Sequence, residues 1–194
     1  MKLLQTEAIV ILAYILCHGL TALLVTPLQS QISPHVTAFA SLLYLPHGVR
    51  VLSAWLLGWR AVLPLCVGAF LSELIFTPAG MSGAASPVIL ASIAVGAVSA
   101  PVAFELLKLM GRNLYAGTGM RIHWSALLVA GILASILNSI GQAEVFSGLI
   151  LPGSSMAVLA VYAIGDLAGL VAATLVLMMV FRWMRLAARP GATR

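Results

Sequence analysis

Residues 42–60, LLYLPHGVRVLSAWLLGWR, decide how this chain is interpreted. The flanks of the stretch are apolar enough to lie in lipid, yet its centre carries Pro46, His47, Gly48 and Arg50. A proline removes a backbone hydrogen bond from a helix interior, and an arginine at the bilayer centre costs about 2.5–3.5 kcal/mol on insertion scales. A residue of that kind normally faces the interior of a helical bundle, so the stretch predicts several membrane helices packed around a polar centre.

The composition of the whole chain is that of an integral membrane protein. Of its 194 residues, 62% are hydrophobic and 8% are charged, whereas a soluble domain carries about 25% charged residues. The mean hydropathy is +1.11. Because the polar connections are short, we expect a single membrane domain over residues 1–194. The net charge of +5 is explained by membrane orientation, so no nucleic-acid partner is expected.

Six apolar segments of spanning length are separated by turn-rich or charged residues. The predicted spans are residues 6–27, 36–58, 61–77, 86–109, 123–147 and 154–182. Lys and Arg fall at the N-terminus, in the second and fourth connections and at the C-terminus, whereas the other three connections contain none. By the positive-inside rule, this alternation predicts that both termini are cytoplasmic. The expected fold is an all-α, polytopic membrane protein with six transmembrane helices.

Five ionisable residues are predicted to share the middle of the bilayer. Their depth, counted from the cytoplasmic ends of the predicted helices at about 1.5 Å per residue, is similar. The five residues are Arg50, His47, His18, Glu73 and Asp166. Glu73 and Asp166 are the acids at the level of Arg50, so we expect one or both to neutralise its charge. Such a cluster is equally consistent with a purely structural role in helix packing.

Two further acids are expected outside this centre. Glu105 precedes Lys108 by three residues, which favours an ion pair at the cytoplasmic surface. Glu144 is expected to be solvated at the outer end of its helix, next to Gln142.

The backbone around Pro46 is the candidate binding pocket. A proline within the predicted span would free carbonyl groups near Leu42 and Leu43 at mid-membrane depth. Such backbone is tolerated in a membrane only where it is buried in protein or lines a wet cavity. The break at Pro46 and Gly48, beside the charge of Arg50, therefore indicates a ligand site.

Other polar residues in the spans leave alternatives open. His18 and His47 have similar predicted depths, so a bis-imidazole haem is one interpretation, and ordinary packing histidines are the other. No other cofactor and no metal site is expected. Four polar residues of the fifth span have the spacing i, i+3, i+4 and i+7, which places them on one face of a helix: Ser135, Asn138, Ser139 and Gln142. We expect this stripe to form interhelical hydrogen bonds.

Three stretches, in order along the chain, resemble the first family of MASE-type membrane-associated sensor domains of bacterial signalling proteins. They are Leu-Pro-His-Gly at residues 45–48 with the following residues 54–60, Gly-Ala-Phe-Leu-Ser-Glu-Leu at 68–74, and Gly-Asp-Leu-Ala-Gly at 165–169. The resemblance implies a location in the bacterial cytoplasmic (inner) membrane and a role in signalling. It selects as functional positions Pro46, Gly48, Gly68, Glu73, Gly165, Asp166 and Gly169. That family usually precedes a cytoplasmic output domain, which residues 1–194 do not contain.

The expected function is a sensor-like membrane module. It would bind a small ligand, a partner membrane protein or a second copy of itself through a polar centre of Arg50, Glu73 and Asp166, with membrane lipids around it. Two alternatives are a small transporter, or the substrate-binding subunit of one, and an accessory subunit of a larger membrane complex. An enzyme is not expected, because no span combines a nucleophile with a base and no zinc-binding or phosphate-binding motif occurs.

Overall fold

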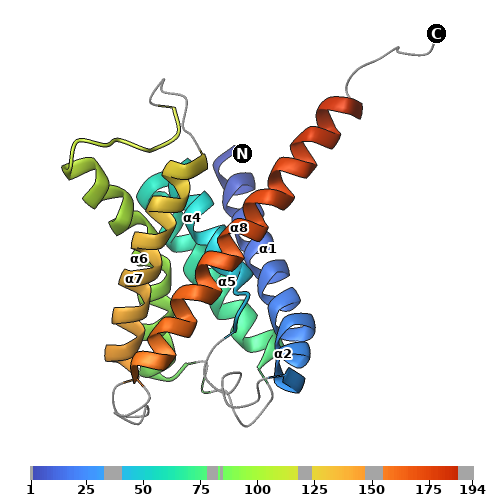
Figure 1. Ribbon diagram of the computed structural model, residues 1–194. Helices are drawn as coiled ribbons and strands as arrows, with labels where there is room; N and C mark the ends of the chain where they lie inside the picture. The colour runs from blue at the N-terminus through green and yellow to red at the C-terminus, as the bar shows by residue number, and fades with distance from the viewer. Residues whose placement is uncertain are drawn as a thin grey trace.

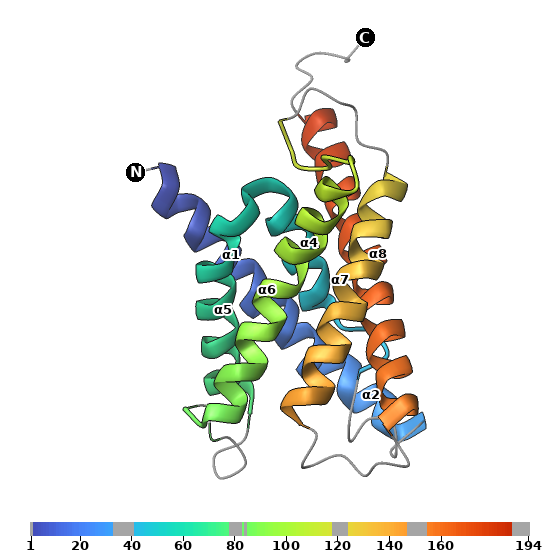
Figure 2. The same ribbon diagram turned by 90° about the vertical axis from the view of Figure 1, so that its left-hand side faces the viewer.

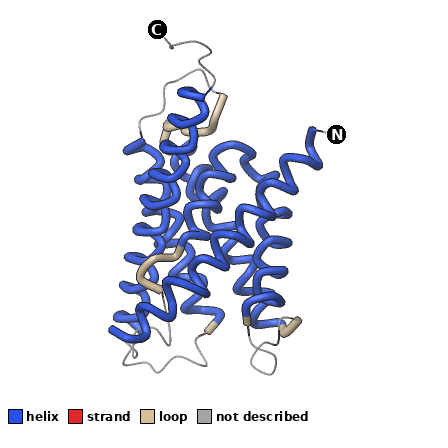
Figure 3. The backbone as a smooth tube through the Cα atoms, turned by 90° about the vertical axis from the view of Figure 1, so that its right-hand side faces the viewer, coloured by secondary structure: helices blue, strands red, loops and turns tan. Residues whose placement is uncertain are grey.

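The computed structural model describes residues 2–32, 41–77, 83, 85–117, 124–146 and 155–187, and its regular elements there are all helices. They form an up-and-down bundle (Figure 1; Figure 3, blue). The α-helices are α1 (Lys2–Leu20), α2 (Thr26–Ile32), α4 (Leu45–Leu57), α5 (Val62–Phe76), α6 (Pro87–Leu109), α7 (Trp124–Val145) and α8 (Ser155–Ala187). The predicted all-α class is confirmed.

Five helical stretches are long and apolar enough to cross a membrane, one fewer than the six predicted. They are Leu4–Gln31, Leu45–Phe76, Pro87–Leu109, Trp124–Val145 and Tyr162–Val180. This set is compatible with a multi-pass membrane protein. The difference in number arises at the second predicted span, residues 36–58.

The helix within that span is short. α4 begins only at Leu45 and has 13 residues, or about 20 Å, whereas the hydrocarbon core of a bilayer is about 30 Å thick. Gly58, with a φ of 59° that favours glycine, then turns the chain into the short 3-10 segment Gly58–Ala61. α4 and α5 therefore run in opposite directions from this turn (Figure 2), and together they make up the stretch Leu45–Phe76. Residues 33–40, the first part of the predicted span, lie outside the described residues.

Pro46 starts α4 and does not kink a longer helix. It lies in the first turn, where the missing N–H breaks no intrahelical hydrogen bond. The predicted kink inside a full-length span is therefore wrong, and the non-helical backbone is residues 41–44, immediately before the helix.

The non-helical segment is half-buried, with Leu42 exposed, and its backbone is hydrogen-bonded to neighbouring elements. The amide of Tyr44 donates to the carbonyl of Gly165 on α8 at 2.9 Å. The carbonyl of Leu43 accepts from the hydroxyl of Ser41 at 3.2 Å and, more weakly, from that of Thr21 at 3.5 Å. Thr21, directly after α1, and Gly165 on α8 thus supply hydrogen bonds that a continuing helix would have supplied.

The first helix is longer than the predicted span, residues 6–27. α1 continues through the π-helical turn Thr21–Val25 into α2. The amide of Thr26 bonds to the carbonyl of Thr21, five residues back. This bulge lies in the turn before Pro27, whose ring would clash with a carbonyl of a regular helix.

Small residues dominate the buried interior and allow the helices to approach closely. One buried cluster joins α4, α6, α7 and α8, and consists of Val51, Ala54, Ala100, Ala103, Phe104, Leu107, Leu127, Ala130, Ala134 and Leu170. A second packs α1 against α4, α5 and α6 around Tyr14 and Leu65. The start of α1, the α4–α5 turn, the end of α6 and the end of α8 all lie at one end of the bundle (Figures 1 and 2).

Candidate functional site

Arg50 is buried in the bundle without a carboxylate partner. Its side chain is 5% exposed, and Nη2 donates to the hydroxyl of Tyr14 at 2.8 Å and to that of Tyr44 at 3.4 Å. The guanidinium carbon lies 5.7 and 5.3 Å from the centroids of these two rings, within cation–π range. Nε has no hydrogen-bond partner in the described part of the chain. The predicted ion pair is wrong, because neither Glu73 nor Asp166 forms a salt bridge with Arg50.

His18 belongs to the same group of side chains. Its ring packs edge-on to Tyr44, with 6.4 Å between ring centroids, and stacks on Phe76 at 5.8 Å. Its Nδ1 is buried and has no hydrogen-bond partner among the described residues. We call Arg50, Tyr14, Tyr44 and His18 the arginine cluster.

Glycines bring the backbones around the arginine cluster close together. A Cβ on Gly96 of α6 would lie 2.5 Å from Nη2 of Arg50, and one on Gly68 of α5 would lie 2.9 Å from Cβ of Tyr14. These two positions therefore accept the guanidinium and the tyrosine only because they lack side chains.

His47 faces a different set of partners. Its Nδ1 lies 3.3 Å from Oδ2 of Asp166, and its Nε2 lies 3.2 Å from the carbonyl oxygen of Gly131 on α7. The two side chains are 0% and 1% exposed. The angles at Nδ1 fall outside those of a hydrogen bond, so an attraction between the two groups would be electrostatic and requires a proton on the histidine. Asp166 also accepts a hydrogen bond from Nδ2 of Asn138 at 3.1 Å.

A line of hydrogen bonds continues from Asp166 towards the opposite end of α7. Nε2 of Gln142 donates to Oδ1 of Asn138 at 3.3 Å and to the carbonyl of Ser92 on α6 at 3.0 Å. The hydroxyl of Ser92 donates back to Oε1 of Gln142 at 2.8 Å. We call His47, Asp166, Asn138, Gln142 and Ser92 the polar chain. The prediction of interhelical hydrogen bonds is confirmed for Asn138 and Gln142.

Three glycines of the sequence resemblance lie where α8 meets the chain around α4. A Cβ on Gly165 would collide with the carbonyl of Ser41, and one on Gly169 would collide with the carbonyl of Tyr44. Gly48 faces Ala173 and the carbonyl of Gly169. These positions allow the close contact that fixes the non-helical segment, and the side chain of Asp166 enters the bundle from between two of them.

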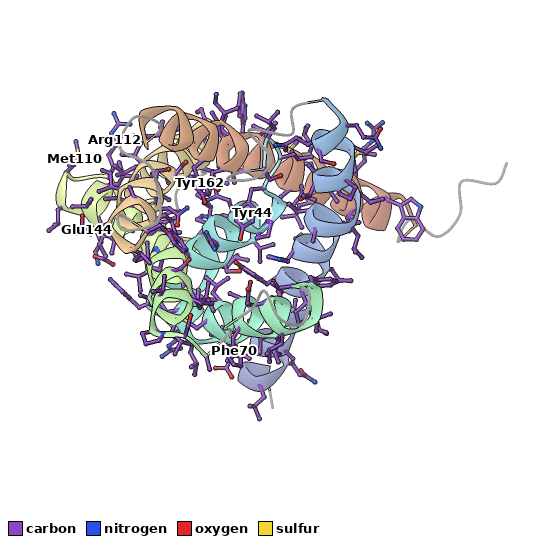
Figure 4. All side chains as sticks on the ribbon, turned by 90° about the horizontal axis from the view of Figure 1, so that it is seen from below. Tyr44, Phe70, Met110, Arg112, Glu144 and Tyr162 are labelled. Atoms are coloured by element: carbon purple, nitrogen blue, oxygen red, sulfur yellow. The ribbon has the colours of Figure 1, made fainter. Side chains whose placement is uncertain are left out.

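The remaining acids lie apart from both groups. Glu73 is half-buried on α5 and forms no ion pair in the described chain. Glu105 is 3.4 Å from Nζ of Lys108, which confirms the predicted pair, and it also accepts a hydrogen bond from the hydroxyl of Tyr115 at 2.8 Å. Glu144 is exposed as predicted, and Figure 4 shows it at the rim of the bundle, whereas Tyr44 points inward.

The two histidines are not placed to share a haem. Both ring nitrogens of His47 face protein oxygen atoms, while His18 lies in the arginine cluster. Among the described residues, no group of three or more His, Cys, Asp or Glu side chains is placed to hold a metal ion.

Two cavities lie away from these groups. One, of about 220 Å³, opens between α7 and α8 and is lined by Trp124, Leu128, Val171, Thr174, Leu175 and Met178. The other, of about 270 Å³, lies beside the α4–α5 turn and is lined by residues that include Gly58, Glu105 and Tyr115. Neither is lined by Arg50 or Asp166.

Comparison with known proteins finds no match. No family model, no curated protein and no solved structure matches the chain. The resemblance to the MASE-type sensor domains therefore stays a prediction.

Sequence reasoning missed Tyr14, Tyr44 and Ser92 as members of the site. The tyrosines stand in apolar runs, where an aromatic residue is an ordinary core residue, and only their packing against Arg50 gives them a further role. An available signal was the presence of polar-tipped aromatics at membrane depth, since a buried tyrosine hydroxyl usually finds a partner.

Chemically, the arginine cluster offers hydrogen-bond donors and a fixed positive charge. The guanidinium is a donor only, and the two phenol groups donate or accept. An anionic group with two or more oxygen atoms is the ligand that best complements this set, because a guanidinium binds such groups with paired hydrogen bonds.

Proposed function

We propose that this chain is a sensor-like, multi-pass protein of the bacterial inner membrane that binds a small anionic ligand at Arg50. The supporting observation is that Arg50 is buried against two phenols without a carboxylate partner. A buried charge without a counter-charge is unfavourable by several kcal/mol, on the order of what a broken buried ion pair costs. An anion at this position would contact the guanidinium directly, whereas Asp166 attracts Arg50 without forming an ion pair with it.

The position of α4 adds to this proposal. The helix begins at Leu45, inside the bundle, and the N-terminal end of a helix carries partial positive charge. Arg50 lies little more than one turn further along. The anion would replace the long 3.4 Å contact between Arg50 and Tyr44, so Tyr44 is the side chain that must move on binding.

α8 offers a route for passing on the bound state. Its 33 residues extend about 50 Å, well beyond the thickness of the hydrocarbon core. Gly165 and Gly169 lie against the segment that ends in Tyr44, whereas the other end of α8 projects from the bundle (Figure 1). A movement of Tyr44 would thus shift a helix that reaches a partner membrane protein, or a second copy, outside the hydrocarbon.

The proposal includes the topology that the charges predict: six crossings with both termini in the cytoplasm. Lys2, Arg60, Lys108, Arg112 and Arg182 belong to elements that end at one side of the bundle, which supports that orientation. Residues 41–44 and α4 would be the described part of the second crossing.

The test is ligand-dependent thermal unfolding of the purified protein in nanodiscs, with small carboxylates, phosphate and sulfate as probes. We expect at least one of these anions to raise the melting temperature of the wild type, by an amount equivalent to about 2.7 kcal/mol at a hundredfold excess over Kd. Arg50→Gln should abolish the shift. Arg60→Gln, which removes an exposed arginine at the α4–α5 turn, is the matched control and should retain it. Equal shifts in wild type and Arg50→Gln, or no shift with any probe, would contradict the proposal.

A small transporter is the second candidate, and the half-length helix α4 favours it. Discontinuous helices whose N-termini face anionic substrates in mid-membrane are a feature of secondary transporters. The two candidates differ in one measurement. Proteoliposomes carrying the protein should accumulate the anion identified above if the chain transports it, and should bind it without uptake if the chain only senses it.

A further inference from the structure

Both ring nitrogens of His47 face oxygen atoms that can accept hydrogen bonds. The carbonyl oxygen of Gly131 is an acceptor only, so Nε2 of His47, 3.2 Å away, must carry a hydrogen atom. In a neutral imidazole Nδ1 is then a bare lone pair. Yet Nδ1 faces Oδ2 of Asp166 at 3.3 Å, and an ionised carboxylate is also an acceptor only.

Two acceptors at this distance, with both side chains excluded from water, repel one another. The amide of Asn138 donates to Oδ2, so it satisfies the carboxyl group without relieving the clash at Nδ1. One proton between His47 and Asp166 removes the conflict, either as imidazolium with carboxylate or as neutral imidazole with carboxylic acid.

We propose that His47 and Asp166 form a proton-binding couple inside the membrane and that its proton is coupled to anion binding at Arg50. With the proton, the couple has no net charge, and Arg50 leaves the centre with one positive charge that favours an anion. Without the proton, the couple is negative and itself balances Arg50. The binding of one anion therefore favours the uptake of one proton. This coupling rests on the proposed function, whereas the presence of the proton on the His47–Asp166 couple does not depend on it.

Few other charges act on the couple. Arg50 on α4, Tyr44 before it and Tyr162 on α8 interact with it electrostatically. α7 and α6 contribute the amides of Asn138 and Gln142 and the hydroxyl of Ser92, which do not titrate. Other described ionisable residues on the neighbouring elements are Tyr14 and His18 in the arginine cluster, half-buried Glu73 on α5, the Glu105–Lys108 pair near the end of α6, and exposed Glu144 near the end of α7.

The hydrogen bonds of the polar chain lead from the couple towards one end of α7. The members of the polar chain run from the His47–Asp166 couple along α7 to Gln142, three residues from the end of that helix. This end lies opposite the end that gathers the Lys and Arg residues (Figure 2). Carboxamides donate hydrogen bonds without releasing their protons, so exchange of the proton at this side, which the proposed topology places outside the cell, would need water beside the polar chain.

The proton itself is tested by solid-state NMR on the wild type in lipid, with ¹⁵N-labelled histidine and ¹³C-labelled aspartate. Asp166 is the only aspartate in the sequence, so its carboxyl signal needs no assignment. At neutral pH, an imidazolium with a carboxylate, or a neutral imidazole with a carboxylic acid, is the expected result. A neutral His47 beside an ionised Asp166 would overturn the proposal, whatever the anion experiments give.

The coupling is tested with the anion identified at Arg50, at a pH above the midpoint at which NMR shows the couple losing its proton. A pH-indicator dye in weakly buffered solution should report the uptake of about one proton per anion bound, and affinity should fall about tenfold per pH unit. Asp166→Asn should bind the anion without proton uptake, and Glu144→Gln, at an exposed acid, should behave as the wild type. Wild-type binding without proton uptake, or a couple that never loses its proton while the protein stays folded, would overturn the coupling. If no anion binds, the proposed function fails while the NMR result still decides whether the couple holds a proton.

Discussion

At the scale of single residues, Arg50 differs from an arginine held in an ion pair. Tyr14 and Tyr44 contact its guanidinium, and their hydroxyl oxygens lie 3.3 Å apart. If the guanidinium is removed, the two hydroxyls remain able to bond to one another, and no partner acid is left bare.

This arrangement predicts which double-mutant cycle shows coupling. The effects of Arg50→Gln and Glu73→Gln on the free energy of unfolding should add to within about 0.5 kcal/mol, because the two side chains share no contact. Arg50→Gln and Tyr14→Phe should be non-additive by about 0.5–3 kcal/mol. Reversible unfolding in mixed micelles measures both cycles. A coupled Arg50–Glu73 pair with an additive Arg50–Tyr14 pair would show that the side chains are arranged differently.

Gly169 gives a second prediction at the residue scale. Its absent Cβ leaves room for the carbonyl of Tyr44, which is backbone and has no room to move aside. Gly169→Ala should therefore destabilise the protein by about 1–3 kcal/mol or more, the range typical of overpacking.

Gly141→Ala is the matched control for that change. A Cβ on Gly141 meets only the side chain of Val95, with its nearest atom at 2.5 Å, and a side chain adjusts at lower cost than backbone. Thermal unfolding of both variants should rank Gly169→Ala as the less stable. The opposite ranking would contradict the close contact between α8 and the non-helical segment.

At the scale of elements, α7 is joined to α8 and α6 by its polar stripe. Asn138 donates to Asp166 and accepts from Gln142, so Asn138→Ala removes one hydrogen bond from each of two buried polar side chains. We expect a loss of about 1–3 kcal/mol in the free energy of unfolding. Glu144→Gln, on the exposed side of the same helix, should change it by no more than about 0.5 kcal/mol. If Asn138→Ala changed the free energy of unfolding no more than that control does, the hydrogen bonds between α7 and α8 would be refuted.

At the scale of the whole molecule, the two ends of α6 are predicted to face opposite sides of the membrane. Single cysteines at Ala85 and Met110, both exposed, in a background with Cys17 and Cys66 changed to serine, test this directly. A membrane-impermeant thiol reagent added to intact cells should label Ala85→Cys, and should label Met110→Cys only after the cells are opened. The reverse pattern would overturn the proposed orientation.

Much of the fold could be predicted because hydrophobic length and turn residues act locally. The third, fourth and fifth predicted spans, residues 61–77, 86–109 and 123–147, match α5, α6 and α7 to within about two residues. The second span could not, because a mean hydropathy does not distinguish a helix that crosses the bilayer from a half-length helix that follows non-helical residues. The hydrogen bonds that hold these non-helical residues come from Thr21 and Gly165, which are distant in sequence.

The sequence by itself determined that this is an all-α protein with several apolar helices. It also determined which ionisable residues lie within those apolar segments. Both follow from the order of side chains along single segments. Only the tertiary structure decided the partners of those residues. It placed Arg50 with two tyrosines and paired His47 with Asp166, although depth along the helix axis predicted Arg50 with an acid. Depth fixes one coordinate of a buried side chain, whereas the rotation and close packing of each helix, set here by glycines at the contacts, fix the direction in which it points.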